Sequence, residues 1–155
     1  MEFERGDTQI LRTLQLEGRI SNQELADRVG MSTSPCWRRV RRLEESGVIK
    51  GYQAILDRKK VGLGVLAFIQ VQIDSHSEAE AQSFEQEVLK LDEVVACYSI
   101  AGGADFLLQV VAADLDSYAD FAMAVVRRLP RIKAMQTMFV LKEIKPLSAL
   151  PLSGG

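Results

Sequence analysis

The sequence predicts a two-part α+β protein, with a helical N-terminal part followed by a part in which strands and helices alternate. Three observations support this. Helical spacing of apolar residues fills most of the first 46 positions, and strand-like alternation mixed with helical spacing begins near residue 63. Between them the composition changes from arginine-rich to rich in valine, alanine and glycine. A domain boundary therefore falls at about residues 52–62.

The first two helices are predicted from their start and stop signals. Asp7 is expected to cap a first helix that stops at Gly18. Ser21 and Glu24 have the spacing of a capping box, in which each side chain bonds the backbone N–H of the other residue. The second helix is expected to end at Gly30, because glycine readily adopts the left-handed conformation at a helix C-terminus.

A third helix begins almost at once after Gly30. Either Ser32 or Ser34 can cap it, and Pro35 is tolerated in its first turn, where a missing N–H costs little. It is expected to run to about residue 46. Two helices joined by so short a turn make a helix-turn-helix. Residues 48–52 resemble a short strand, which predicts a wing.

The second part follows the order βαββαβ. The expected strands cover residues 63–73, 94–101, 105–113 and 132–144, and the expected helices cover residues 78–91 and 115–129. The Gly-Gly-Ala sequence at residues 102–104 joins the second and third strands as a hairpin. This order predicts the ferredoxin-like arrangement, so the fold class is α+β with a winged helix-turn-helix and a ferredoxin-like domain.

Charge is distributed unevenly along the chain. The formal net charge is −2, but residues 31–60 carry 8 Lys and Arg against 3 Asp and Glu, whereas residues 61–155 carry 7 against 12. A basic segment beside an acidic one predicts that only the first part meets a polyanion. We expect a DNA-binding domain at residues 1–52, a linker at 53–62, a sensing and oligomerisation domain at 63–147 and a tail at 148–155.

Composition excludes several classes of protein. Hydrophobic residues make up 47% and charged residues 26%, which is typical of a soluble globular chain, and no apolar run is long enough for a membrane span. The N-terminal sequence lacks the apolar segment of a secretory signal, and two cysteines cannot form a disulfide framework, so we expect a cytoplasmic protein without membrane contact. His76 is expected on the surface. We predict no catalytic residues, no metal and no cofactor.

The third helix has the pattern of a DNA-reading helix. On a helical wheel Cys36, Val40 and Leu43 form one apolar stripe, while arginines occupy the opposite side. Arginine can bind phosphate or the edge of guanine in a bidentate manner. The alternative is a solvated helix whose arginines pair with glutamates, and Trp37 fits the core or the DNA side equally well. The residues expected to contact DNA are Ser32, Thr33, Ser34, Trp37, Arg38, Arg41 and Arg42.

A specific resemblance lies at these residues. The run GRISNQELADRVGMSTSPCWRRVRRLEESGVIKGY, residues 18–52, resembles the DNA-binding domain of the leucine-responsive and asparagine-responsive regulators, the Lrp/AsnC family. The likeness extends from about residue 6 to residue 147. It implies a sequence-specific transcriptional regulator that binds double-stranded DNA as a homodimer, assembles further into octamers, and senses an amino acid through its βαββαβ domain.

The resemblance also indicates where the amino acid binds. Two glycines at the hairpin tip expose backbone N–H groups to an anion, and Asp105 can pair with an ammonium group, although a Gly-Gly turn by itself is usually only a turn. The family's G-x-x-D turn matches residues 102–105, and its amino-acid site lies between neighbouring dimers. The residues expected to line that cleft are Tyr98, Ile100, Gly102, Gly103, Ala104, Asp105, Leu115, Thr137, Met138, Phe139 and Val140.

Two rival functions remain open from the sequence. One is a sensor or regulatory subunit whose ferredoxin-like domain binds an amino acid and whose helical domain docks on a protein. The other is a small enzyme, which is disfavoured because no nucleophile–base pair, metal cluster or phosphate-binding loop can be found. DNA binding that weakens steeply with salt would separate the regulator from the sensor.

Overall fold

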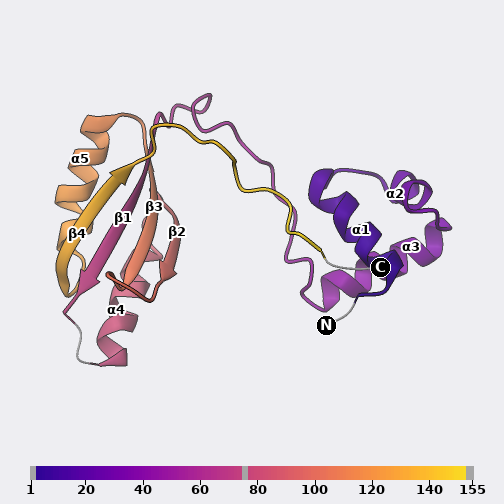
Figure 1. Cartoon of the computed structure of the whole chain (residues 1–155), viewed down its shortest axis with the longest axis horizontal. Coiled ribbons are helices and arrows are strands. Elements are labelled where there is room, and N and C mark those ends of the chain that lie inside the picture. The colour runs from indigo at the N-terminus through magenta and orange to yellow at the C-terminus, as the bar shows by residue number, and fades with distance from the viewer. Residues whose placement is uncertain (1–2, 75–76, 153–155) are drawn as a thin grey trace. The chain divides into compact units, whose positions relative to one another are not determined.

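The computed structural model describes residues 3–74 and 77–152 (Figure 1). His76 lies outside the described residues. The contacts divide the chain into two units. One contains the residues up to Ile55 together with those from Lys145 onward, and the other is Leu56–Ile144. Within the described part of the chain, no helix has the length and apolar character that crossing a membrane requires.

The first unit is built from three helices around one apolar core. These helices are α1 (Arg5–Leu16), α2 (Asn22–Val29) and α3 (Thr33–Glu45). The predicted stripe of α3 is confirmed, because Cys36, Val40 and Leu43 are buried in a cluster with apolar residues of α1 and α2. Cys36 is fully buried, and this burial raises the pKa of its thiol. It therefore acts as a small packed residue of the core.

The capping box between the first two helices is confirmed. Ser21 Oγ accepts a hydrogen bond of 3.2 Å from the N–H of Glu24, and Glu24 Oε2 accepts one of 3.1 Å from the N–H of Ser21. Gly30 follows α2 with φ of +68°, the left-handed conformation that favours glycine. Ser32 rather than Ser34 occupies the N-cap position of α3, without a side-chain cap bond. The short turn of the predicted helix-turn-helix is therefore present.

Two local predictions for the first unit are wrong. Asp7 does not cap α1; the helix begins at Arg5, and Asp7 lies in its first turn with its carboxylate directed at arginines of α3. The segment 48–52 is not a strand, since it pairs with no other segment among the described residues. A strand needs a neighbour to bond its N–H and C=O groups, and here Ile49 N–H instead bonds back to the carbonyl of Leu43 at 3.0 Å.

The C-terminal segment returns to the first unit along α1. Arg12 Nη2 donates to the carbonyl oxygen of Leu152 at 2.8 Å, and the N–H of Leu150 donates to Gln15 Oε1 at 2.6 Å. The Leu152 side chain packs against the apolar cluster of the three helices. The end of the described chain is therefore part of the helical unit.

The second unit is a four-stranded antiparallel sheet with helices on one face (Figure 1). Its elements are β1 (Val65–Ile73), α4 (Glu78–Val88), β2 (Val94–Ser99), β3 (Phe106–Ala112), α5 (Leu115–Ala124), a 3₁₀ turn (Val126–Arg128) and β4 (Ile132–Phe139). The strand order β2-β3-β1-β4 is that of the predicted ferredoxin-like fold. Each strand is shorter than predicted, because pairing stops where a partner strand ends.

The core of this unit follows from alternation along the strands. Ala67, Ile69 and Val71 of β1 are buried with Phe84 of α4 and Phe121 of α5. Alternate residues point to opposite faces of a strand, so the other residues of β1 lie on a face that no helix of this unit covers. That helix-free face carries Phe68, Gln70 and Gln72 from β1, and register adds Leu107, Gln109, Gln136 and Met138 from the neighbouring strands.

The capping box gives a first testable prediction. We expect Ser21→Ala to lower the free energy of unfolding of the helical unit by about 1 kcal/mol, because one N–H at the start of α2 loses its partner. Denaturant unfolding followed by the fluorescence of Trp37, the single tryptophan, measures this change. Ser83→Ala, at an exposed position of α4, should leave the Trp37 transition in place. An unchanged transition in Ser21→Ala would contradict the prediction.

Candidate functional site

The exposed side of α3 divides into an outward ridge and a flank. Residues three or four apart share a helix face, so Ser34, Arg38 and Arg41 form the outward ridge. Arg39 and Arg42 lie on the flank that faces α1. Ser32, Thr33 and Ser34 are exposed at the N-terminal end of the helix. The small and basic residues predicted to contact DNA are therefore accessible together.

The ridge arginines differ in their partners. Arg38 forms no ion pair with any residue that the structure describes, so its guanidinium is open to a ligand. Arg41 Nε lies 3.2 Å from Glu45 Oε1, and its guanidinium carbon lies 5.2 Å from the ring centroid of Trp37. This cation–π contact holds Arg41 on the surface. Trp37 is 43% exposed, which places it on the outside of the helix and not in the core.

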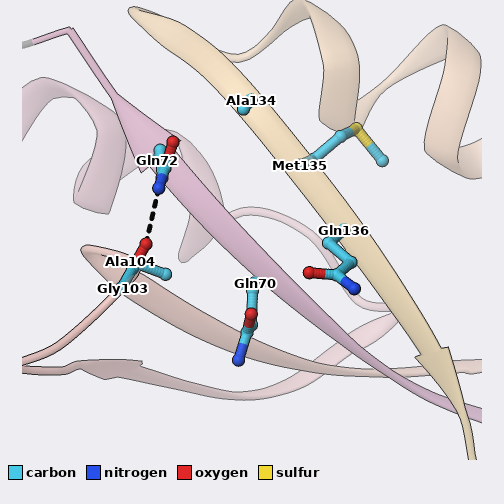
Figure 2. A pocket seen from close by; sticks show the side chains of 7 residues that line it. All are labelled: Gln70, Gln72, Gly103, Ala104, Ala134, Met135 and Gln136. Carbon is cyan, nitrogen blue, oxygen red and sulfur yellow. Dashed lines mark hydrogen bonds between the residues drawn. The ribbon is translucent and has the colours of Figure 1, made fainter.

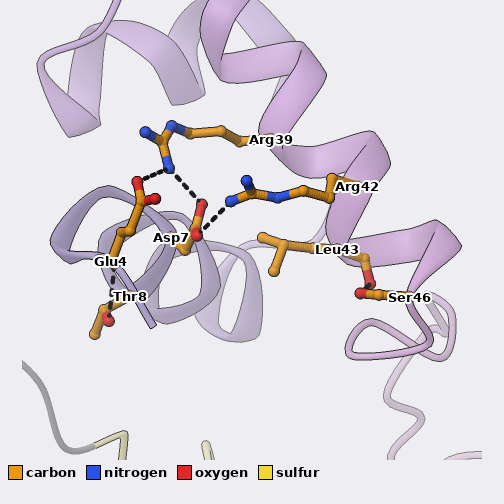
Figure 3. A network of polar contacts seen from close by, with 7 residues as sticks. All are labelled: Glu4, Asp7, Thr8, Arg39, Arg42, Leu43 and Ser46. Atoms are coloured by element: carbon orange, nitrogen blue, oxygen red, sulfur yellow. Dashed lines mark hydrogen bonds and ion pairs between the residues drawn. The ribbon is translucent and has the colours of Figure 1, made fainter. Parts of the chain in front are cut away.

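The flank arginines are bound to an acidic residue of α1 (Figure 3). Arg39 Nη1 lies 2.9 Å from Asp7 Oδ1, and Arg42 Nη2 lies 2.6 Å from Asp7 Oδ2. Arg39 also lies 2.7 Å from Glu4 Oε2. The hydrogen bonds that Arg39 donates to Asp7 and Glu4 raise the pKa of Arg39. Asp7 and Arg39 were not among the predicted site residues. The sequence offers one weak signal for each: Asp7 is an acidic residue at the start of α1, and Arg39 lies at the edge of the predicted apolar stripe.

The hairpin tip is held to the end of β1. The N–H of Ile100 donates to the carbonyl of Asp105 at 2.9 Å and closes the turn, and Gly102 has φ of +143°. Asp105 Oδ2 accepts a hydrogen bond of 2.8 Å from the N–H of Ile73. Gln72 Nε2 donates to the carbonyl of Gly103 at 2.5 Å. Asp105 therefore fixes the turn and remains exposed at the surface.

A hollow of about 150 Å³ adjoins this turn on the helix-free face (Figure 2). Side-chain amides of Gln70, Gln72 and Gln136 lie around it, together with Gly103 and Ala104. The amides offer both donors and acceptors, which suits a small polar ligand. The glutamines were not predicted as site residues, although Gln70 and Gln72 alternate in β1, and Gln136 of β4 pairs with Gln70 on the same face.

Four other predicted cleft residues lie at the opposite end of the sheet: Leu115, Thr137, Phe139 and Val140. The hydroxyl of Tyr118 lies 2.5 Å from Thr137 Oγ1, and its ring meets that of Phe139 edge-on at 5.0 Å. Phe139 pairs with Ala67, six residues before Ile73 in β1, so the two ends of the strand are about 20 Å apart. Leu115 and Val140 belong to this end as well, since α5 follows the end of β3 and Val140 N–H bonds Leu66.

The predicted cleft residues therefore form two groups within one chain. The first group is Tyr98, Ile100, Gly102, Gly103, Ala104 and Asp105. The second is Leu115, Thr137, Phe139 and Val140. Met138 points to the helix-free face, because alternation puts it opposite Thr137 and Phe139. In the parts of the chain that the structure covers, no cluster of three or more His, Cys, Asp or Glu residues could hold a metal ion.

Comparison with known families identifies both units. The family model described as Lrp/AsnC ligand binding domain matches residues 66–150. The model described as winged helix-turn-helix DNA-binding matches residues 7–50. The first match covers the sheet unit with its hairpin tip, and the second covers α1 to α3. Each unit therefore carries the sequence signature of the role that its exposed residues indicate.

Relatives match over nearly the whole chain. The leucine-responsive regulatory protein of Rhizobium meliloti is 39% identical over 145 residues, which cover 94% of this chain and 93% of that protein. The DNA-binding transcriptional activator DecR of Escherichia coli is 34% identical over 146 residues, covering 94% of this chain and 96% of the relative. One relative is thus named a regulatory protein and the other a transcriptional activator.

Solved structures of transcriptional regulators also match nearly the whole chain. A transcriptional regulator of Neisseria meningitidis in complex with L-Met is 37% identical, with a TM-score of 0.91 and coverage of 96% of each chain. An AsnC family transcriptional regulator of Agrobacterium tumefaciens is 36% identical, with a TM-score of 0.91 and coverage of 96% of this chain and 97% of the other. The chain therefore belongs to the Lrp/AsnC family and is an effector-responsive, DNA-binding transcriptional regulator.

Proposed function

We propose that α3 enters the major groove of DNA and that its outward ridge reads the sequence. The observation that carries this proposal is the position of Arg38, whose guanidinium is exposed on the side of α3 opposite the buried stripe. Such a guanidinium can hold the O6 and N7 atoms of guanine in a bidentate manner. Arg41 and Ser34 share its face, while Thr33, Ser32 and Trp37 flank it.

The test of DNA binding is its dependence on salt. The intact protein is used to select a duplex from a random-sequence pool, and the dissociation constant is measured between about 50 and 200 mM salt. Contacts to phosphates displace bound counterions, so the logarithm of the affinity should fall linearly with the logarithm of the salt concentration. Absent binding, or binding that salt leaves unchanged, would favour the rival function of docking on a protein.

We further propose that the effector is an amino acid. Asp105 would pair with its ammonium group, and the exposed backbone of Gly102 and Gly103 would bind its carboxylate. The L-Met complex of the related Neisseria regulator supports an amino acid as ligand. Phe139, which is partly exposed, favours an effector with a partly apolar side chain.

The effector site on this proposal needs two protomers. The hairpin group with Asp105 and the group of Thr137 and Phe139 lie at opposite ends of the same sheet, too far apart to contact one small molecule. A site formed from both groups therefore joins the hairpin of one protomer to the β4 end of another. Binding at such a junction would favour one assembly over another, which couples the effector to DNA occupancy.

A thermal-shift screen over the twenty amino acids identifies the effector, with L-Met as the first candidate. A ligand that binds only the folded state raises its apparent stability, by about 2.7 kcal/mol at a concentration one hundred times the dissociation constant. A screen in which no amino acid raises the transition temperature would contradict an amino-acid effector.

We propose a homodimer formed through the helix-free face of the sheet, with octamers as the higher assembly. Phe68, Leu107, Tyr98 and Met138 leave apolar surface on this face, whereas helices cover the opposite one. A sheet gains stability when both of its faces are covered. A two-fold dimer would meet DNA half-sites about one helical turn, ~34–36 Å, apart. Sedimentation equilibrium of the intact protein measures the assembly directly.

The remaining assignments follow from the same proposal. DNA binding is assigned to residues 1–52, linkage to residues 53–62, and sensing and assembly to residues 63–147. Because its partner is the DNA of the cell, we place the protein in the cytoplasm. We propose that the protein binds its ligands without catalysing a reaction, and that it needs no catalytic residue, metal or cofactor.

A further inference from the structure

The flank of α3 has a feature that the outward ridge lacks, namely a fixed acidic anchor. Asp7 lies on α1 with only 5% of its side chain exposed, and each of its carboxylate oxygens holds a different arginine of α3. The two arginines reach it from positions 32 and 35 residues further along the chain. Long arginine side chains lose much conformational freedom in such contacts, so Arg39 and Arg42 are held in one arrangement.

These anchored arginines line a groove beside the helix. The groove, which we call the arginine groove, is formed by Pro35, Arg38, Arg39 and Arg42 and has a volume of about 320 Å³. A guanidinium has five N–H donors, and the bonds to Asp7 and Glu4 engage one terminal nitrogen of each flank arginine. Donors on both side chains are left over, and 58% of the Arg42 side chain is exposed.

Charge in the arginine groove favours an anion. Arg38, Arg39 and Arg42 supply three positive charges, and Asp7 and Glu4 supply two negative ones on the side toward α1. The excess of positive charge is therefore on the open side of the groove. Guanidinium groups bind phosphate with good geometry and keep their charge at any pH of interest. A phosphate is the anion that the flank of a DNA-reading helix meets, because the groove walls of a duplex are its backbone.

We propose that the arginine groove binds one backbone phosphate of DNA and that Asp7 is the positioning residue that arranges Arg39 and Arg42 for it. This inference rests on the proposed docking of α3 in the major groove. The two sides of α3 then have different roles. The outward ridge with Arg38 and Arg41 reads bases, whereas the flank with Arg39 and Arg42 fixes the position of the helix on the DNA backbone.

Salt dependence and sequence preference together test the phosphate contact. The probes are the duplex selected by the intact protein and a duplex of unrelated sequence and equal length. For Arg39→Ala and Arg42→Ala we expect about tenfold weaker binding to both duplexes, an unchanged ratio between the two affinities, and a salt slope smaller by about 1. Arg127→Ala, which removes one exposed positive charge from the sheet unit, is the matched control and should retain the slope.

An unchanged salt slope in both flank variants would overturn the proposal, as would a loss of sequence preference, which marks a base contact. These outcomes are distinct from failure of the proposed function, in which the unaltered protein itself shows no salt-dependent binding to either duplex. That result would overturn both, because no phosphate contact could then exist.

The role of Asp7 is tested by whether Asp7→Asn weakens or tightens DNA binding. Asp7→Asn removes a negative charge near the DNA, which by electrostatics alone would tighten binding. Loss of the anchor instead frees two arginine side chains, each of which must then be ordered on binding, so we expect about fivefold weaker binding to both duplexes. Binding that is equal or tighter in a folded Asp7→Asn variant would overturn the positioning role. Should this variant fail to fold, Arg42→Lys keeps the charge but removes the guanidinium that is proposed to bond Asp7 and the phosphate together, and unweakened binding would then overturn the role.

Discussion

Replacing Arg38 and Arg41 together by alanine is expected to weaken binding to the selected duplex by at least about 100-fold and to abolish the preference for it over an unrelated duplex. Each arginine that holds a base edge contributes ~1–3 kcal/mol of discrimination, and both lie on the outward ridge of α3. Fluorescence anisotropy with both duplexes, at two salt concentrations, measures the affinity and the preference. The flank variants, by contrast, should keep the preference while losing affinity.

This double variant should fold normally, because neither side chain belongs to the apolar cluster of the helical unit. Arg41 pairs with the exposed Glu45 and lies over the ring of Trp37, both on the surface, so its removal costs little stability. A matched control, Arg127→Ala with Arg128→Ala, removes two positive charges from the sheet unit. If the ridge variant retained its sequence preference, α3 could not be the element that reads bases.

Local features of the first unit could be predicted from the sequence because each depends on residues close together in the chain. The capping box of Ser21 and Glu24 spans three residues, and the stripe of Cys36, Val40 and Leu43 lies within two turns of one helix. Asp7 could not be predicted correctly in the same way. Its partners lie 32 and 35 residues away, and an acidic residue at the start of a helix usually caps it. Only the packing of α1 against α3 shows that it serves two arginines.

In the second unit as well, features that depend on neighbouring residues could be predicted, and features that depend on distant residues could not. The glycines predicted the hairpin between β2 and β3, because a tight turn depends on residues next to one another in the chain. The distance between the two groups of cleft residues could not be predicted, because it depends on strand register. Pairing of Ala67 with Phe139 and of Val71 with Phe106 puts the β4 residues and the hairpin tip at opposite ends of the sheet. The predicted strand order implies that these are opposite ends, but the residues that pair are known only from the structure.

Asp105→Asn is expected to weaken effector binding by about 100-fold and to remove the effect of the effector on DNA binding. The substitution exchanges a carboxylate for a neutral amide, so an ammonium group would lose its charged partner, which typically costs 2–5 kcal/mol when the pair is out of contact with water. Asparagine keeps an oxygen that can accept the hydrogen bond from the N–H of Ile73, now 2.8 Å from Asp105 Oδ2. The fold of the hairpin should therefore persist, which separates the loss of ligand from a loss of structure.

Two further variants separate the role of Asp105 in effector binding from its role in stability. Asp105→Ala removes both the charge and the bond to Ile73, so it should lose effector binding and also unfold more easily, by about 1 kcal/mol. Asp120→Asn removes an equal charge from an exposed position of α5 and should leave the response intact. Isothermal titration with the amino acid from the thermal-shift screen measures binding, and denaturant unfolding measures stability. Since Asp105 bonds the backbone in this structure, a purely structural role predicts that asparagine substitutes for it without loss. A full response of Asp105→Asn to the effector would establish that role and place the ammonium site elsewhere.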